Sequence, residues 1–173
     1  STHCISSAAS DVYKRQVVAR PRSWAVVREF THEDIRDFGE VREAIETLIF
    51  VFAAERHTDE GIARLRAAYE REFAAASADE VEAARIAAGE FHEIAAELAG
   101  NEMLGELIAV FVTRLRWLFG QHDDLLGMAE EHRLILDAVA ARDTDTLRWM
   151  IPRHLASGQE AAERRLSDQA YSI

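Results

Sequence analysis

The sequence predicts an all-α fold, an antiparallel bundle of about six helices. Hydrophobic residues make up 49% of the 173 residues, and only two prolines and eight glycines interrupt them. Apolar side chains recur at three- and four-residue spacing from residue 31 onward, which is the period of an amphipathic helix. No segment after Phe30 shows the sustained alternation of apolar and polar residues that indicates a half-buried strand.

Start and stop signals divide this region into separate helices. Most starts have an N-capping residue with acidic side chains in the first turn, whereas Gly100-Asn101 and Gly120 are typical stops. Ser77 with Glu80 has the spacing of a capping box. The expected helices begin near Thr31, Thr58, Ser77, Glu102, Asp123 and Asp143, and they end near Phe52, Phe73, Gly100, Phe119, Ala141 and Ser167.

The first 30 residues lack this helical period. Residues 1–16 are serine-rich, and residues 11–16 resemble the in-frame translation of a sequencing adapter. We therefore interpret residues 1–16 as an assembly artefact, or else as a disordered tail. On the first interpretation the natural gene continues upstream. Residues 17–30 hold two strand-like patches, at 17–19 and 24–27, and Pro21 breaks any helix between them.

Charge and composition exclude several classes of protein. The net charge is −11, which argues against binding of this chain to a nucleic-acid phosphate backbone by electrostatic attraction. The longest purely apolar run, Leu48 to Ala54, is too short to span a bilayer, and the polar N-terminus does not read as a signal peptide. The single cysteine, Cys4, excludes an internal disulfide framework. We expect a cytoplasmic protein with no membrane partner.

Three histidines, His92, His132 and His154, each lie on the apolar stripe of a different expected helix. Met128 and Leu136, for example, flank His132 at a spacing of four residues. Burying an imidazole costs free energy unless it is hydrogen-bonded or ligated, and neutral imidazole is the commonest metal ligand. Three inward imidazoles in one bundle therefore predict a shared metal site. The alternative for each is an ordinary hydrogen-bonded core residue.

Arginines also fall among the apolar positions. Arg42 lies four residues after Phe38 on the first expected helix, and a buried guanidinium needs an anionic partner. On one interpretation that partner is Glu46, one turn later. On the other, the Arg42 guanidinium forms a bidentate pair with the carboxylate of a ligand bound inside the bundle. Arg114 and Arg116 are interleaved with apolar residues on the fourth expected helix, and spacing does not decide which of them faces the pocket.

Five motifs, in the correct order, resemble the C-terminal effector-binding (FCD) domain of GntR-type transcription regulators of the FadR class. The match covers residues 31 to about 166. It also implies that residues 17–30 are the remnant of a linker from an N-terminal winged helix-turn-helix, absent here, and that 31–168 is the effector-binding domain. The motifs are Asp34 to Glu46, Phe91-His92, Gly100-Asn101-Glu102-Met103-Leu104, Glu131-His132-Arg133 with Ile135 to Val139, and Arg142-Asp143 leading to Arg153-His154-Leu155.

The resemblance implies a homodimer in which one aspartate and three histidines hold a divalent metal. The histidines map to His92, His132 and His154, but the aspartate maps to Ala88. Three nitrogens still suit zinc, with nickel or manganese as alternatives, if water or an effector carboxylate completes the shell. The lost oxygen ligand predicts a weaker or empty site. The candidate effector-binding residues are Arg42, Asn101, Arg114 and Arg116.

These observations support one main functional hypothesis. It is the ligand-sensing domain of a truncated regulator that binds a small organic acid at the metal and reaches operator DNA only through the missing domain. The alternatives are a metal-free effector-binding domain and a structural helical dimer. A metallohydrolase is a further possibility because an open three-histidine site can activate water, but no general base accompanies the histidines. We therefore expect a protein that is not an enzyme.

Overall fold

The computed structural model describes residues 17–18, 26–27, 31–109 and 123–170. The chain divides into two units, of which residues 1–31 are the first. In that unit β1 (Val17–Val18) pairs antiparallel with β2 (Val26–Val27), so that Val17 faces Val27. The two strand-like patches expected from the sequence therefore pair with each other.

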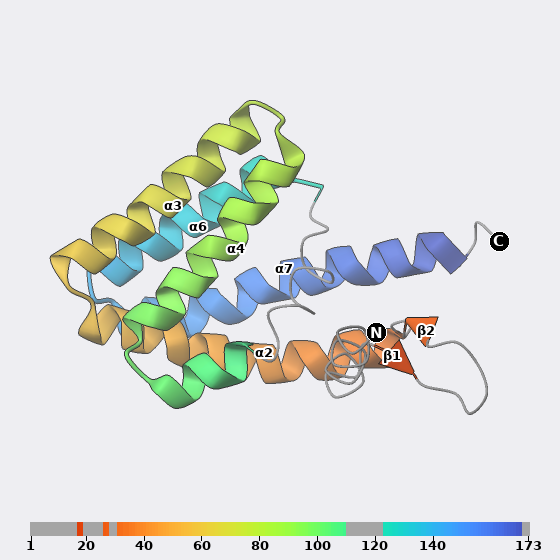
Figure 1. Cartoon of the computed structure of the whole chain (residues 1–173), viewed down its shortest axis with the longest axis horizontal. Coiled ribbons are helices and arrows are strands. Elements are labelled where there is room, and N and C mark those ends of the chain that lie inside the picture. The colour runs from red at the N-terminus through yellow and green to blue at the C-terminus, as the bar shows by residue number, and fades with distance from the viewer. Residues whose placement is uncertain (1–16, 19–25, 28–30, 110–122, 171–173) are drawn as a thin grey trace, which may run out of the picture. The chain divides into compact units, whose positions relative to one another are not determined.

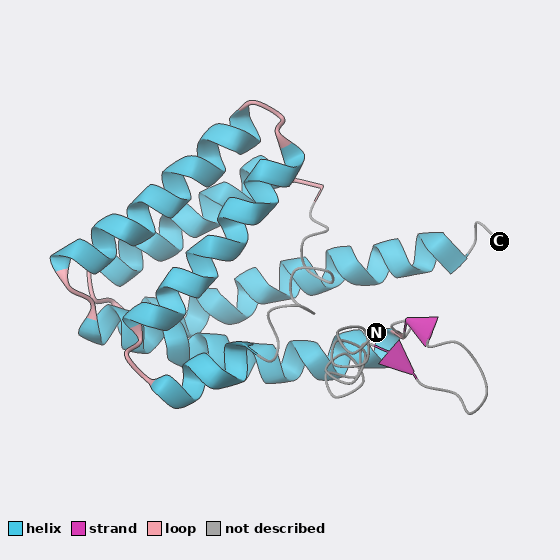
Figure 2. Cartoon of the chain, viewed as in Figure 1, coloured by secondary structure: helices cyan, strands magenta, loops and turns pink. Residues whose placement is uncertain are grey.

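The second unit, from residue 32 onward, is helical in its described parts (Figure 2). Residues 102–109 are also helical, and the rest of the fourth expected helix, to Phe119, lies outside the described residues. The last helix continues through Pro152 and ends three residues beyond the expected Ser167. The described helices are α2 (His32–Arg56), α3 (Asp59–Ser77), α4 (Val81–Leu98), α6 (Leu125–Ala140) and α7 (Thr144–Ala170).

Side-chain caps fix several helix starts. The Oγ1 of Thr58 accepts the backbone N–H of Gly61 at 3.1 Å, and Asp124 caps α6 in the same way through Gly127. Each such cap is worth about 1 kcal/mol, since it satisfies a donor that the helix leaves without a partner. Thr58 therefore caps α3 as the sequence predicted.

The expected capping box at Ser77 is wrong. Ser77 is the last residue of α3, and Glu80, which precedes α4, makes no capping hydrogen bond through its side chain. The turn is made by Asp79, whose φ of 58° lies in the left-handed region that aspartate tolerates better than most residues. Continuing α3 to Ser77 also buries Ala75 and Ala76 against the neighbouring helix α4, which the capping box would forgo.

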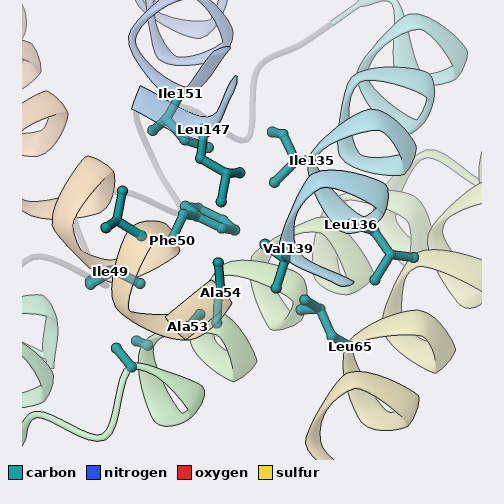
Figure 3. Close-up of a cluster of buried hydrophobic side chains, with 14 of the residues drawn as sticks. Ile49, Phe50, Ala53, Ala54, Leu65, Ile135, Leu136, Val139, Leu147 and Ile151 are labelled. Atoms are coloured by element: carbon teal, nitrogen blue, oxygen red, sulfur yellow. The ribbon is translucent and has the colours of Figure 1, made fainter. Parts of the chain in front are cut away.

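In the second unit α3 and α4 run antiparallel, as do α2 and α7 (Figure 1), and the buried apolar side chains form a large cluster and a smaller one. Helix α3 packs against α4 and α6, while α2 packs against α7 and α4. Figure 3 shows the centre of this core, where Phe50 of α2 meets Leu147 and Ile151 of α7 and Ile135 and Val139 of α6. Full burial of each such side chain contributes roughly 1.5–3 kcal/mol. The all-α expectation is confirmed.

None of the helices in the described part of the chain combines the length and the apolar character that crossing a bilayer requires. Their apolar side chains instead face one another across the bundle.

Candidate metal centre

The three histidines of the apolar stripes converge in the interior. His92 comes from α4, His132 from α6 and His154 from α7. Their Nε2 atoms form a triangle, with 3.1 Å between His92 and His132, 3.2 Å between His132 and His154, and 3.5 Å between His154 and His92. Among the described residues these three side chains form a group close enough to hold a metal ion.

The size of this triangle fits a tetrahedral metal. Zinc binds imidazole nitrogen at about 2.0–2.1 Å, so two ligands of a tetrahedral zinc lie roughly 3.3–3.4 Å apart. The Nε2 separations of 3.1, 3.2 and 3.5 Å bracket that value. The three rings could therefore serve as three corners of a tetrahedron without moving by more than a few tenths of an ångström.

A different glutamate holds the Nδ1 atom of each ring. His92 donates to Oε2 of Glu46 on α2 at 2.6 Å, and His132 donates to Oε2 of Glu72 on α3 at 2.7 Å. His154 donates to Oε2 of Glu131 on α6, also at 2.7 Å. An ionised carboxylate only accepts hydrogen bonds, so opposite Glu46, whose pKa is lowered, the Nδ1 of His92 bears the proton. Neutral rings in this tautomer direct their Nε2 lone pairs toward the centre of the triangle.

The electrostatics of the site keep its imidazoles available as ligands. Burial lowers the pKa of His154 to about 3, against the opposing effect of its hydrogen bond to Glu131. His154 is therefore neutral near pH 7. Burial alone would raise the pKa of Glu46, but the Arg42 guanidinium and His92 outweigh it and hold that pKa well below its ordinary value. Glu46 is therefore ionised.

The walls of the site are aromatic. The ring of Phe91 stacks on His132 with centroids 4.6 Å apart, and the Phe50 ring meets His92 edge to face at 5.5 Å. His132 and His154 are buried, whereas the side chain of His92 is 18% exposed. Solvent therefore reaches the cluster at its His92 side.

Position 88 offers the cluster no oxygen donor. Ala88 lies one turn before His92 on α4, and it is buried in a small apolar group with Ala84, Leu125 and Met128. Since side chains four residues apart lie on one face of a helix, Ala88 and His92 share the inward face of α4. The site thus has three nitrogen donors. At position 88, from which α4 could have supplied a fourth ligand, there is only the methyl group of Ala88.

The candidate effector residues have ordinary partners where the structure describes them. Arg42 is 9% exposed, and its Nε donates to Oε1 of Glu46, the same carboxylate that holds His92. Asn101 caps the helical segment 102–109, because its Oδ1 accepts the backbone N–H of Leu104 at 3.2 Å. Arg114 and Arg116 lie outside the described residues. An effector role for these four residues stays a prediction.

The three glutamates were not among the residues that the sequence singled out as histidine partners. Glu72 follows Leu65 and Ala68 on the buried stripe of α3. The sequence analysis placed the end of that stripe at Phe73 instead, but the Phe73 side chain is 43% exposed. A charged residue at a stripe position was the available signal. Glu131 gave no such signal, because it precedes His132 on α6 but bonds to His154 of another helix.

Comparison with known proteins identifies the class. The sequence model of the FCD domain family matches residues 37–157, and the chain belongs to that family. The HTH-type transcriptional repressor NanR of Salmonella schwarzengrund is 29% identical over 164 residues, which are 83% of this chain and 60% of the relative. NanR of Salmonella newport is also 29% identical, over 162 residues, with the same shares. The chain thus spans about 60% of the length of these curated relatives.

Solved structures share the fold. Escherichia coli McbR/YncC has a TM-score of 0.81 at 17% identity, over 91% of this chain and 81% of that chain. A GntR transcriptional regulator from Rhodococcus sp. RHA1 has a TM-score of 0.72 at 19% identity, over 89% of this chain and 75% of that chain. The resemblance inferred from the five motifs is confirmed, and the relatives are transcription regulators rather than enzymes.

The buried pair of Arg42 and Glu46 yields a stability prediction. The variant Arg42→Met should lower the free energy of unfolding by about 3–5 kcal/mol, because it leaves the Glu46 carboxylate buried without its guanidinium. Adding Glu46→Gln should recover part of that loss. The exposed pair of Arg64 with Glu97 is the control, and Arg64→Met should cost less than about 1 kcal/mol in urea denaturation. Equal losses for both single variants would contradict the analysis.

Proposed function

We propose that this domain senses a small carboxylate at a divalent metal centre formed by His92, His132 and His154. The observation that supports it is the triangle of Nε2 atoms at 3.1–3.5 Å, with each Nδ1 bonded to a carboxylate. Lone pairs aimed at one point repel one another, and a cation at that point turns the repulsion into ligation. Carboxylates on the outer nitrogens of metal-ligating histidines are a common arrangement in metal sites.

Zinc suits this donor set best. Three imidazole nitrogens at tetrahedral spacing favour zinc. Nickel also binds imidazole and is the second candidate, whereas manganese prefers oxygen ligands. A bound divalent cation would supply positive charge and a coordination position for an oxygen ligand. Because Ala88 fills the place of a possible fourth protein ligand, that position is left to water or to an exchangeable carboxylate.

The route of the effector follows from burial. His92 is the most exposed of the three rings, so a small acid would enter beside it. Arg42 is one candidate for contact with such an acid, since it lies one turn from Glu46, whose carboxylate bonds to His92. Arg114, Arg116 and Asn101 remain further candidates for orienting the effector.

The signal would pass to a DNA-binding domain. The curated relatives are named as HTH-type repressors, and this chain matches 60% of their length. We propose that residues 31–168 are the sensory domain of such a regulator, that residues 17–30 join it to a helix-turn-helix, and that two copies form a homodimer acting on DNA in the cytoplasm. Linkage requires the effector to bind two arrangements of the dimer with different affinity.

The metal site can be tested by stoichiometry. Protein stripped with a chelator and then dialysed against limiting zinc should retain about one zinc per chain, measured by inductively coupled plasma mass spectrometry. His132→Ala should lose most of it, since a buried ligand is removed, whereas His32→Ala should retain it because His32 is exposed. Circular dichroism confirms that both variants fold. Zinc bound equally by both variants would refute the site.

The carboxylate proposal predicts a ligand-dependent gain in melting temperature. Zinc-loaded protein is screened with mono-, di- and hydroxycarboxylates, each paired with its amide. At least one acid should raise the melting temperature, with about 2.7 kcal/mol of stabilisation at a hundredfold excess over Kd. The amide, which lacks the anionic oxygen, should not. A panel of acids without effect, with or without zinc, would count against a carboxylate sensor.

A further inference from the structure

The carboxylate of Glu46 is shared between a histidine of the cluster and a guanidinium. Its Oε1 accepts a hydrogen bond from Nε of Arg42, one turn earlier on α2, and its Oε2 accepts one from Nδ1 of His92 on α4 at 2.6 Å. The Glu46 side chain is 3% exposed, compared with 9% for Arg42 and 18% for His92. Both oxygens of one buried carboxylate are therefore engaged, by donors from two different helices.

Two donors on one carboxylate compete for its negative charge. A carboxylate on the outer nitrogen of a metal-ligating histidine orients the ring and makes the inner nitrogen a stronger donor to the metal. A guanidinium hydrogen-bonded to the same carboxylate neutralises part of that charge, because charge-assisted hydrogen bonds are the strong ones. Glu46 should therefore strengthen the Nε2 of His92 less while Arg42 is paired with it than it would alone.

We propose that Arg42 is a positioning residue that lowers the affinity of the histidine cluster for a divalent cation, and that it acts through Glu46 on His92. This inference rests on the proposed metal function. An anion that pairs with Arg42 in place of Glu46 would restore the full charge of the carboxylate, so the anion and the metal would each raise the affinity for the other. Arg42 would then be a point of regulation distinct from the coordination position on the metal.

The first test removes the charge of Arg42 with Arg42→Gln, whose side-chain amide can still donate a hydrogen bond to Glu46. Zinc affinity is measured by competition with a chromogenic chelator. It should rise about 3- to 10-fold, a fraction of the roughly 10- to 100-fold that the partners of metal-ligating histidines are worth. Removal of a residue that only holds the fold together would not raise the affinity.

Arg36→Gln is the matched control. It removes a guanidinium from the same helix, but this side chain is 58% exposed and pairs with Glu33 and Asp37 at the surface. Because water and salt screen such a charge, zinc affinity should stay within about twofold of wild type.

Glu46→Gln tests the route through the carboxylate. Glutamine offers one acceptor oxygen to the two donors, so Arg42 or His92 loses its partner, and zinc affinity should fall about 10- to 100-fold. In this background, adding Arg42→Gln should change the zinc affinity by less than about twofold, because the carboxylate through which Arg42 acts is gone. The double variant thus separates the effect through Glu46 from any other contact of the guanidinium.

Arg42→Lys is the conservative variant. It keeps a positive charge beside Glu46, and its zinc affinity should stay within about threefold of wild type. Circular dichroism of the metal-free protein establishes that each variant folds. If Arg42→Gln does not fold, an unchanged affinity in Glu46→Gln or a tenfold rise in Arg42→Lys would still overturn the proposal.

The outcomes distinguish this inference from the function on which it rests. A wild-type chain that binds no zinc would overturn both. Tight zinc binding by wild type, with an affinity that falls or stays the same in Arg42→Gln, would overturn the inference alone and leave Arg42 a structural residue. A rise of equal size with Glu46 and with Gln at position 46 would mean that Arg42 repels the cation directly, and it would overturn the route through the carboxylate.

Discussion

Three imidazole lone pairs directed at one point constitute the physical constraint on which the rest of the structure depends. They come from α4, α6 and α7, and carboxylates from α2, α3 and α6 set their direction. Every described long helix of the bundle therefore contributes a ligand or its support. Because the Nε2 atoms approach within 3.1–3.5 Å, the arrangement is unfavourable for neutral rings alone and favourable around a cation.

This polar cluster lies inside an apolar bundle, and that position would connect stability with the proposed sensing of a ligand. Phe50 packs against His92 and Phe91 against His132, and this apolar packing strengthens the charge interactions of the buried part of the site. The same exclusion makes an unbalanced charge there costly. On the proposed function, occupancy of the site would therefore change the free energy of the whole helical unit, and a ligand that completes the metal shell would bias how its helices pack.

Periodicity predicted the helices and placed the three histidines inside, because both depend on local spacing along one helix. It failed where the outcome depends on contacts between helices. The sequence ended the stripe of α3 at Phe73 because Phe is apolar. The buried residue is instead Glu72, whose carboxylate is hydrogen-bonded to His132 of α6, and spacing within α3 does not indicate that contact. Glu131 bonds across to α7, which spacing within α6 does not indicate. Helix α3 continues to Ser77 because burying Ala75 and Ala76 stabilises the fold more than the expected cap at Ser77 would.

X-ray absorption at the zinc edge tests the central claim most directly, since it reports which atoms surround the metal. Zinc-loaded protein should show three nitrogen neighbours at about 2.0–2.1 Å, with the multiple scattering of imidazole, and an oxygen neighbour in the fourth position. The imidazole signal should correspond to three rings, those of His92, His132 and His154. A shell of oxygens alone, or one with a single imidazole, would mean that the metal sits elsewhere and would contradict the account.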